Sequence, residues 1–167
     1  MNIALRLSSL LSLLLSGAIF GFFYAWICST MWGLDAADPR VAIAAMQAMN
    51  ASVRNAVFAP AFFGTPLVLA VTAALALLAG YRRAALAFAL AAGVYALGGL
   101  VLTATVNVPM NEALATVVVP ADIGEAEAIW NDYSRPWQAW NITRTIASGT
   151  ALLLTGVALM LLRPVKS

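Results

Sequence analysis

The sequence predicts an all-α protein: an integral membrane, antiparallel four-helix bundle with an additional amphipathic helix in the first outer loop. Hydrophobic residues make up 63% of the 167 residues and charged residues only 10%, and the mean hydropathy is +0.90. A soluble domain has about 45–50% apolar residues. Four apolar stretches are each close to the ~20 residues that cross a bilayer. All seven carboxylates lie outside these stretches, in two segments that we expect to be inter-helix loops.

The first span is expected at about residues 7–28. This apolar stretch is longer than the about 7–15 residues of a signal-peptide core, so we expect it to be retained as a helix. In the segment that follows, Asp38-Pro39 has the pattern of an N-cap followed by proline at the first helical position. Apolar residues then recur at helical spacing, which predicts an amphipathic helix. It either lies on the membrane surface or folds back onto the bundle, and we favour the second arrangement.

The second span is expected at about residues 56–79 and the third at about residues 84–106. Pro60 and Pro66 predict a kinked or broken outer half of the second span. The turn between the two spans is very short, so they should be antiparallel neighbours. Small residues would permit close contact between helices of one chain or between subunits of a homo-oligomer. They are Gly93, Gly98, Gly99, Gly149 and Gly156.

The fourth span is expected at about residues 142–162, after a long polar section over residues 107–140. Four spans and their connections use nearly all of residues 1–167, which favours a single membrane domain. Five of the nine lysines and arginines fall on the side of the termini and four on the other side. The paired arginines of the short loop and the charges of the C-terminal tail lie directly at span ends, which favours both termini in the cytoplasm. We expect the membrane to be the plasma (inner) membrane.

Composition also excludes several classes of function. The net charge of +2 comes from scattered basic residues, which argues against a nucleic-acid partner. The sequence has no histidine, which excludes histidine-ligated metal sites and a serine–histidine–aspartate triad. Cys28 is the one cysteine, so a thiolate cluster cannot form within the chain, and we expect it to be a small buried hydrophobe. We therefore predict no metal and no cofactor, and the lipid bilayer as the main partner.

Three groups of polar residues are expected to converge at the outer end of the bundle. The residues of the first group lie on one face of the third helix if that helix continues past Pro109. The residues of the second group form a stripe at the start of the fourth helix. The third group leads into the second span. The groups are Asn107 with Asn111, then Trp137 with Trp140, Asn141 and Arg144, and finally Asn50 with Arg54.

Arg144 is the leading candidate for binding a ligand. A guanidinium group with amides nearby suits an oxyanion, a carboxylate or a phenolate. A buried arginine in a membrane helix is costly unless it is paired or functional. The alternative is a structural role, in which Arg144 extends to the membrane interface or pairs with Asp132 or Glu112. Either of these two carboxylates is also a candidate general base.

The aromatic residues of the long polar section have two interpretations. Tryptophan and tyrosine concentrate at membrane interfaces, and we favour this role for Trp130 and Tyr133. Trp137 and Trp140 share a helix stripe with Arg144. For these two residues, forming the wall of a site for a flat aromatic ligand is an alternative of equal weight to the interface role.

Several stretches resemble the anthrone oxygenase-like proteins, a family of small four-span membrane proteins that is mostly bacterial, with fungal relatives in polyketide pathways. They are Gly21-Phe22-Phe23-Tyr24-Ala25-Trp26, Asn107-Val108-Pro109-Met110-Asn111 with Leu114, Trp137-Gln138-Ala139-Trp140-Asn141-Ile142-Thr143-Arg144-Thr145, and the loop end Arg54-Asn55. For the fungal members, the resemblance implies oxidation of an anthrone to an anthraquinone by dioxygen, with no evident metal or flavin.

The resemblance also implies roles for the candidate residues. Glu112 or Asp132 would be the base, Arg144 with Asn111 and Asn141 the anion clamp, and Trp137 with Trp140 the walls of the pocket. The sequence leaves two hypotheses open. The protein is either a cofactor-independent oxygenase of anthrone-like aromatic substrates or a non-enzymatic membrane protein that binds a lipid-like or quinone-like small molecule.

Overall fold

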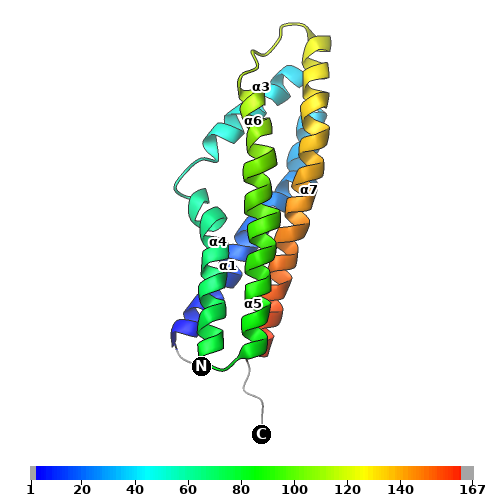
Figure 1. The fold of residues 1–167 in the computed structure, drawn as a ribbon. Coiled ribbons are helices and arrows are strands. Elements are labelled where there is room, and N and C mark those ends of the chain that lie inside the picture. The colour runs from blue at the N-terminus through cyan, green and yellow to red at the C-terminus, as the bar shows by residue number, and fades with distance from the viewer. Residues whose placement is uncertain (1–2, 163–167) are drawn as a thin grey trace.

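The computed structural model describes residues 3–162 and is built from helices that lie side by side in an elongated bundle (Figure 1). Four helical stretches are long and apolar enough to cross a membrane: Ile3–Asp35, Phe58–Leu78, Arg82–Ala115 and Ile123–Leu161. The chain is therefore an all-α integral membrane protein, as the sequence predicted.

The four spans are divided into the following elements. The first contains α1 (Ile3–Ala25), the π-helical turn η1 (Trp26–Thr30) and α2 (Met31–Asp35); the second is α4 (Phe58–Leu78); the third contains α5 (Arg82–Tyr95), η2 (Ala96–Val101), η3 (Thr103–Asn107) and α6 (Val108–Ala115); and the fourth is α7 (Ile123–Leu161). The tight turn between α4 and α5 contains Gly80 at φ 86°, a backbone conformation that favours glycine. This turn makes α4 and α5 antiparallel neighbours.

The amphipathic helix α3 (Pro39–Ser52) folds back onto the bundle, which confirms the favoured arrangement. Asp38 is its N-cap and accepts a hydrogen bond from the backbone N–H of Arg40 at 2.9 Å. Its apolar face is buried through Ala42, Ile43 and Met46. The side-chain amide of Gln47 donates to the carbonyls of Leu114 and Val117 at 2.8 and 2.9 Å, fixing α3 against the end of α6. We call this end of the bundle the α3 end.

Three of the four helical stretches extend well beyond the predicted spans, and the first runs on to Asp35. The third continues to Ala115, and the fourth begins at Ile123 with Asp122 as its N-cap. The expectation that all carboxylates lie in loops is therefore wrong, because hydropathy marks the part of a helix that contacts lipid and not the end of the helix. Five of the carboxylates lie on these extensions: Asp35, Glu112, Glu125, Glu127 and Asp132.

We predicted a kinked or broken outer half for the second span, and the helix α4 runs without a break through Pro60 and Pro66, so the break is wrong and the kink stays a prediction. The carbonyl that Pro66 leaves without a helical partner accepts a hydrogen bond from Tyr95 instead. Close packing of the third and fourth spans depends on Gly98, where an added Cβ would come within 2.5 Å of the Cβ of Ala147. This glycine therefore serves a contact within the chain.

The α3 end has its own core, and it buries two aromatic residues that we had assigned to the membrane interface. Trp130 and Tyr133 are only 4% and 7% exposed. The indole of Trp130 donates to Asp35 at 2.9 Å, and the hydroxyl of Ser134 donates to the same carboxylate at 2.7 Å. Asp35 thereby ties α2 to α7. Cys28, which we expected to be buried, is exposed on η1.

Candidate functional site

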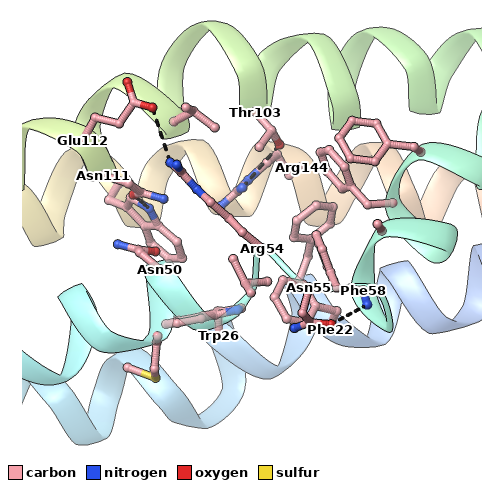
Figure 2. A pocket seen from close by; sticks show the side chains of 18 of the residues that line it. Phe22, Trp26, Asn50, Arg54, Asn55, Phe58, Thr103, Asn111, Glu112 and Arg144 are labelled. Carbon is pink, nitrogen blue, oxygen red and sulfur yellow. Dashed lines mark hydrogen bonds and ion pairs between the residues drawn. The ribbon is translucent and has the colours of Figure 1, made fainter. Parts of the chain in front are cut away.

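A cavity of about 620 Å³ lies at the α3 end, between the ends of the spans and under α3. Its volume falls in the range of about 300–1,000 Å³ that is typical of ligand sites. The wall is mostly apolar, with aromatic side chains from α1, η1, α4 and α7. Six of the ten predicted site residues line it (Figure 2): Asn50, Arg54, Asn111, Glu112, Trp137 and Arg144.

The other four predicted residues do not line this cavity. Asn141 is buried behind Arg144, and Asn107 is fully buried with neither amide atom paired within residues 3–162. Asp132 is exposed, and Trp140 is 41% exposed. At 100° per residue, Trp140 points about 60° away from Trp137 on α7, which places it at the edge of the predicted stripe.

Arg144 is the one cavity-lining group that combines a full charge with burial, since it is only 5% exposed. Its Nη1 donates to the hydroxyl of Thr103 at 3.3 Å, and its Nη2 donates to Oδ1 of Asn141 at 2.9 Å. Within the described chain its Nε has no partner. The guanidinium carbon lies 4.7 Å from the ring centre of Phe23 and 5.1 Å from that of Trp137. The cation is thus held between two aromatic rings and two neutral oxygens.

No carboxylate of residues 3–162 forms an ion pair with Arg144, so the alternative pairing with Asp132 or Glu112 is wrong. Glu112 pairs with Arg54 instead, at 3.3 Å. Both side chains of that pair line the cavity and are about three-fifths exposed, at 60% and 61%, so they lie at its open side; Figure 2 shows the ion pair. A buried cation that lacks a counter-ion is destabilising, which makes the space beside Arg144 suited to an anion.

A hydrogen-bond network fixes the direction of the Asn111 amide. Trp137 Nε1 donates to Oδ1 of Asn111 at 2.9 Å, and the hydroxyl of Tyr133 donates to the same oxygen at 2.8 Å. Tyr133 in turn accepts from Nδ2 of Asn50 at 3.3 Å. Because an indole N–H can only donate, the acceptor must be the amide oxygen. Nδ2 of Asn111 has no acceptor in the described part of the chain, so its two hydrogens are available to a ligand.

Tyr133 and the aromatic wall from α1 and α4 were not among the predicted site residues. Tyr133 lies four residues before Trp137, so it shares the stripe of Trp137 and Arg144, and this spacing could have revealed it. Phe22, Phe23 and Trp26 belong to a motif that was noted only as part of a family resemblance. Two π-helical turns bring Trp26 and Thr103 to the cavity, and turns of this kind are frequent at functional sites.

The described residues contain no group of three or more cysteine, aspartate or glutamate side chains that could hold a metal ion. Two polar groups of the wall, the buried guanidinium of Arg144 and the oriented amide of Asn111, are instead suited to binding an organic anion, and the wall also contains the Arg54–Glu112 ion pair.

Comparison with known families decides the affiliation of the chain. A family model described as anthrone oxygenase matches residues 54–154, which is more than half of the chain. The chain belongs to the anthrone oxygenase family. No curated protein and no solved structure matches it. The part that matches the anthrone oxygenase family contains five of the predicted residues in the cavity wall: Arg54, Asn111, Glu112, Trp137 and Arg144. Phe22, Phe23 and Trp26 of the aromatic wall come from α1 and η1, outside the matched part, whereas the aromatic residues of α4 and α7 lie inside it.

Proposed function

We propose that this member of the anthrone oxygenase family is a cofactor-independent oxygenase that converts anthrone-like aromatic substrates to quinones with dioxygen. The observation that supports this most directly is the buried guanidinium of Arg144, which lines the cavity between two aromatic rings without a carboxylate partner among the described residues. An aromatic ligand with a negatively charged oxygen would complete this arrangement. Its rings would pack on the aromatic walls, and its oxygen would supply the missing charge.

The reaction begins with removal of a proton from the methylene carbon of the anthrone. Glu112 is the candidate base because it is the one carboxylate in the cavity wall. The negative charge that forms spreads to the carbonyl oxygen, where Arg144 stabilises it. The amide hydrogens of Asn111 give a second donor for this oxygen. The chain would then bind the anion more tightly than the neutral substrate, which is what lowers the barrier to proton removal.

Oxidation follows from the electron-rich anion itself. The anion transfers one electron to dioxygen, and the two radicals combine to form a carbon–oxygen bond at the former methylene carbon. The peroxide takes back the proton from Glu112. The oxygen–oxygen bond then breaks as the remaining hydrogen leaves that carbon, which gives the second carbonyl. One anthrone and one dioxygen thus yield one anthraquinone and one water, and Glu112 returns to the carboxylate form.

A second candidate function is non-enzymatic binding of a lipid-like or quinone-like molecule. The observation that favours it is the state of Glu112, whose side chain is 60% exposed and already paired with Arg54. A base is most effective when it is desolvated beside its substrate. In this alternative, the cavity and Arg144 hold an anionic or quinone oxygen without any proton transfer.

Oxygen consumption tests the proposal. The protein in nanodiscs is supplied with a model anthrone, and spontaneous autoxidation is subtracted. We expect turnover by the wild type, loss of turnover in Arg144→Ala, and normal turnover in Arg135→Ala, which removes an exposed arginine of the same helix. A wild-type rate equal to the background rate would contradict the oxygenase proposal for this substrate class and favour the binding role.

We also propose that the protein lies in the plasma (inner) membrane with both termini in the cytoplasm. The short α4–α5 turn lies at the end of the bundle opposite the α3 end (Figure 1), and paired arginines follow it at positions 82 and 83. Such residues favour the cytoplasmic side. Reporters fused at residues 82 and 122 should map to opposite sides of the membrane, with residue 82 inside. Reporters on the same side would contradict the topology.

A further inference from the structure

A second, smaller hollow of about 490 Å³ adjoins the main cavity between α1, α3 and α4. The two spaces have six wall residues in common, so only these side chains separate them: Phe22, Trp26, Met49, Val53, Asn55 and Phe58. The rings of Phe22 and Phe58 meet in this partition, with centres 4.7 Å apart. The movement of a few side chains would therefore join the smaller hollow to the space beside Arg144.

The wall of the smaller hollow offers no charged side chain, and the hydroxyl and amide groups that line it are already hydrogen bonded; the indole N–H of Trp26 is its remaining polar group. The hydroxyl of Ser52 donates to the carbonyl of Met49 at 3.0 Å. Asn55 donates to the carbonyl of Ser52 at 2.7 Å and accepts from the backbone N–H groups of Val57 and Phe58 at 2.9 and 3.0 Å. A polar ligand group placed here would find few partners to replace the hydrogen bonds to water that it loses. The hollow is therefore suited to hydrocarbon.

The hollow also lies where hydrocarbon is available. Ala18 of α1 and Val57 at the start of α4 line it and are exposed, Val57 by 89%. Both α1 and α4 belong to spans that can cross the membrane. The smaller hollow is thus open at the outer surface of the bundle between α1 and α4, whereas the charged side chains of the two walls, Arg54, Glu112 and Arg144, all line the main cavity.

We propose that the smaller hollow holds the hydrocarbon substituent of an amphiphilic aromatic ligand whose anionic oxygen lies against Arg144. The ligand class is an alkylated hydroxy-polycyclic aromatic that reaches the site from the bilayer between α1 and α4. The two adjoining spaces together have a charged end at Arg144 and an apolar end in the smaller hollow. This arrangement matches a molecule with one acidic ring system and one hydrocarbon chain. This inference rests on the proposed function for the site at Arg144 and extends it to the substrate class.

The test compares unsubstituted anthrone with an anthrone that carries an n-decyl chain on the ring away from the methylene carbon. Ala61→Phe fills the smaller hollow, because Ala61 lines that hollow and not the main cavity. We expect it to raise the ratio of the two KM values, decyl over unsubstituted, by about tenfold or more, since each methylene moved from water into an apolar site adds to affinity. Ala70→Phe makes the same change at an exposed site of α4 that lines neither space, and it should leave the ratio unchanged.

Ala18→Phe provides a second variant that enters the same hollow from α1, and its side chain replaces an exposed methyl group. Equilibrium binding of hydroxyanthraquinone with and without the decyl chain gives a readout that does not depend on turnover. If neither the wild type nor any variant turns over anthrone, but Ala61→Phe or Ala18→Phe selectively weakens binding of the decyl compound, the oxygenase proposal fails and the hydrocarbon compartment stands. An unchanged ratio of KM values or binding constants in both variants would mean that bilayer lipid alone fills the hollow, and would overturn the inference.

Discussion

Tyr95 supplies the hydrogen bond that Pro66 denies to the carbonyl of Phe62. The tyrosine hydroxyl, on α5, donates to this oxygen on α4 at 3.0 Å. In an uninterrupted helix the donor would be the backbone N–H four residues later, but that residue is Pro66, which has none. Inside a bilayer no water can replace the missing partner. Because Tyr95 is fully buried, this contact lets α4 continue unbroken beside the cavity.

Tyr95→Phe should lower the free energy of unfolding by about 1–3 kcal/mol, the cost of leaving a buried carbonyl without a partner. In a Pro66→Ala background the helix regains its own donor, so the same substitution should cost clearly less. Unfolding of the four variants in mixed micelles forms a double-mutant cycle. Tyr24→Phe, at a side chain that is 49% exposed, is the control and should have little effect. An equal loss with and without the proline would contradict this role of Tyr95.

The N-terminus of α3 should respond to acid. The side chain of Arg40 hydrogen bonds to Asp38, and together with the backbone N–H of Arg40 it lowers the pKa of this carboxyl from 3.8 to about 2. Since the folded pKa is the lower one, the stabilisation of α3 is complete above about pH 4 and is lost as the pH falls towards 2. Hydrogen exchange of the α3 amides, corrected for intrinsic rates, should show this loss.

The control for this acid response is Asp38→Asn, which keeps a good N-cap acceptor but cannot titrate. Protection of α3 in the variant should stay constant between about pH 4 and about pH 2. If wild type and variant lost protection to the same extent over that interval, the carboxylate of Asp38 would not be the cause.

The spans and the start of α3 could be predicted from the sequence because their signals are local. An apolar run of sufficient length identifies a span, and Asp38-Pro39 identifies a helix start. The true ends of the third and fourth helices, at Ala115 and Ile123, could not be predicted in this way. Hydropathy reports which residues prefer lipid, and a polar helix that continues beyond the bilayer has the same composition as a loop. Whether residues 1–167 form one folding unit stays a prediction.

The candidate site was predicted in part, and the reasons for the rest are geometric. Arg144 and Asn111 followed from helical spacing. Trp140 points outward from α7 and Tyr133 points inward. Helical spacing shows which residues share a face of α7, but it does not show where the centre of the buried face lies. The π-helical turns at Trp26–Thr30 and Thr103–Asn107 also change which side chains face inward. The pairing of Glu112 with Arg54 required the fold-back of α3, a long-range event.

A carboxylate placed beside Arg144 should compete with the ligand. Thr103 already contacts Nη1 of Arg144, so Thr103→Asp would supply the counter-charge that the described chain lacks at this point. Thr103→Asn is the matched neutral variant of nearly equal size. We expect the affinity for an anionic hydroxyanthraquinone to be at least about tenfold lower in the aspartate variant than in the asparagine variant, a difference of about 1.4 kcal/mol. Equal affinities in the two variants would show that the ligand does not depend on the charge of Arg144.

Glu112 and Arg54 should affect different kinetic constants. Glu112→Gln removes the candidate base, so kcat should fall by about 100-fold or more, the usual contribution of a positioned base. Arg54→Ala breaks the same ion pair but keeps the carboxylate, so it should mainly raise KM. The pair is largely exposed, and its loss should cost less than about 1 kcal/mol in stability in either variant. Steady-state kinetics with the model anthrone would contradict the assignment if both variants lost kcat to the same extent.

Tyr133 should act through Asn111. Its hydroxyl is one of two donors that hold the Asn111 oxygen and thereby direct the amide hydrogens to the ligand. Tyr133→Phe leaves Trp137 as the one remaining donor, so the amide can rotate, and KM should rise a few-fold while kcat changes little. Asn111→Asp puts a carboxylate oxygen in place of the N–H donors and should weaken binding of an anionic ligand more strongly, by about tenfold or more, since two like charges would meet in the cavity. Binding of hydroxyanthraquinone and steady-state kinetics would measure both effects. If Tyr133→Phe lowered thermal stability with no change in KM, the tyrosine would be a packing residue, and the direction of the Asn111 amide would be set by Trp137 alone.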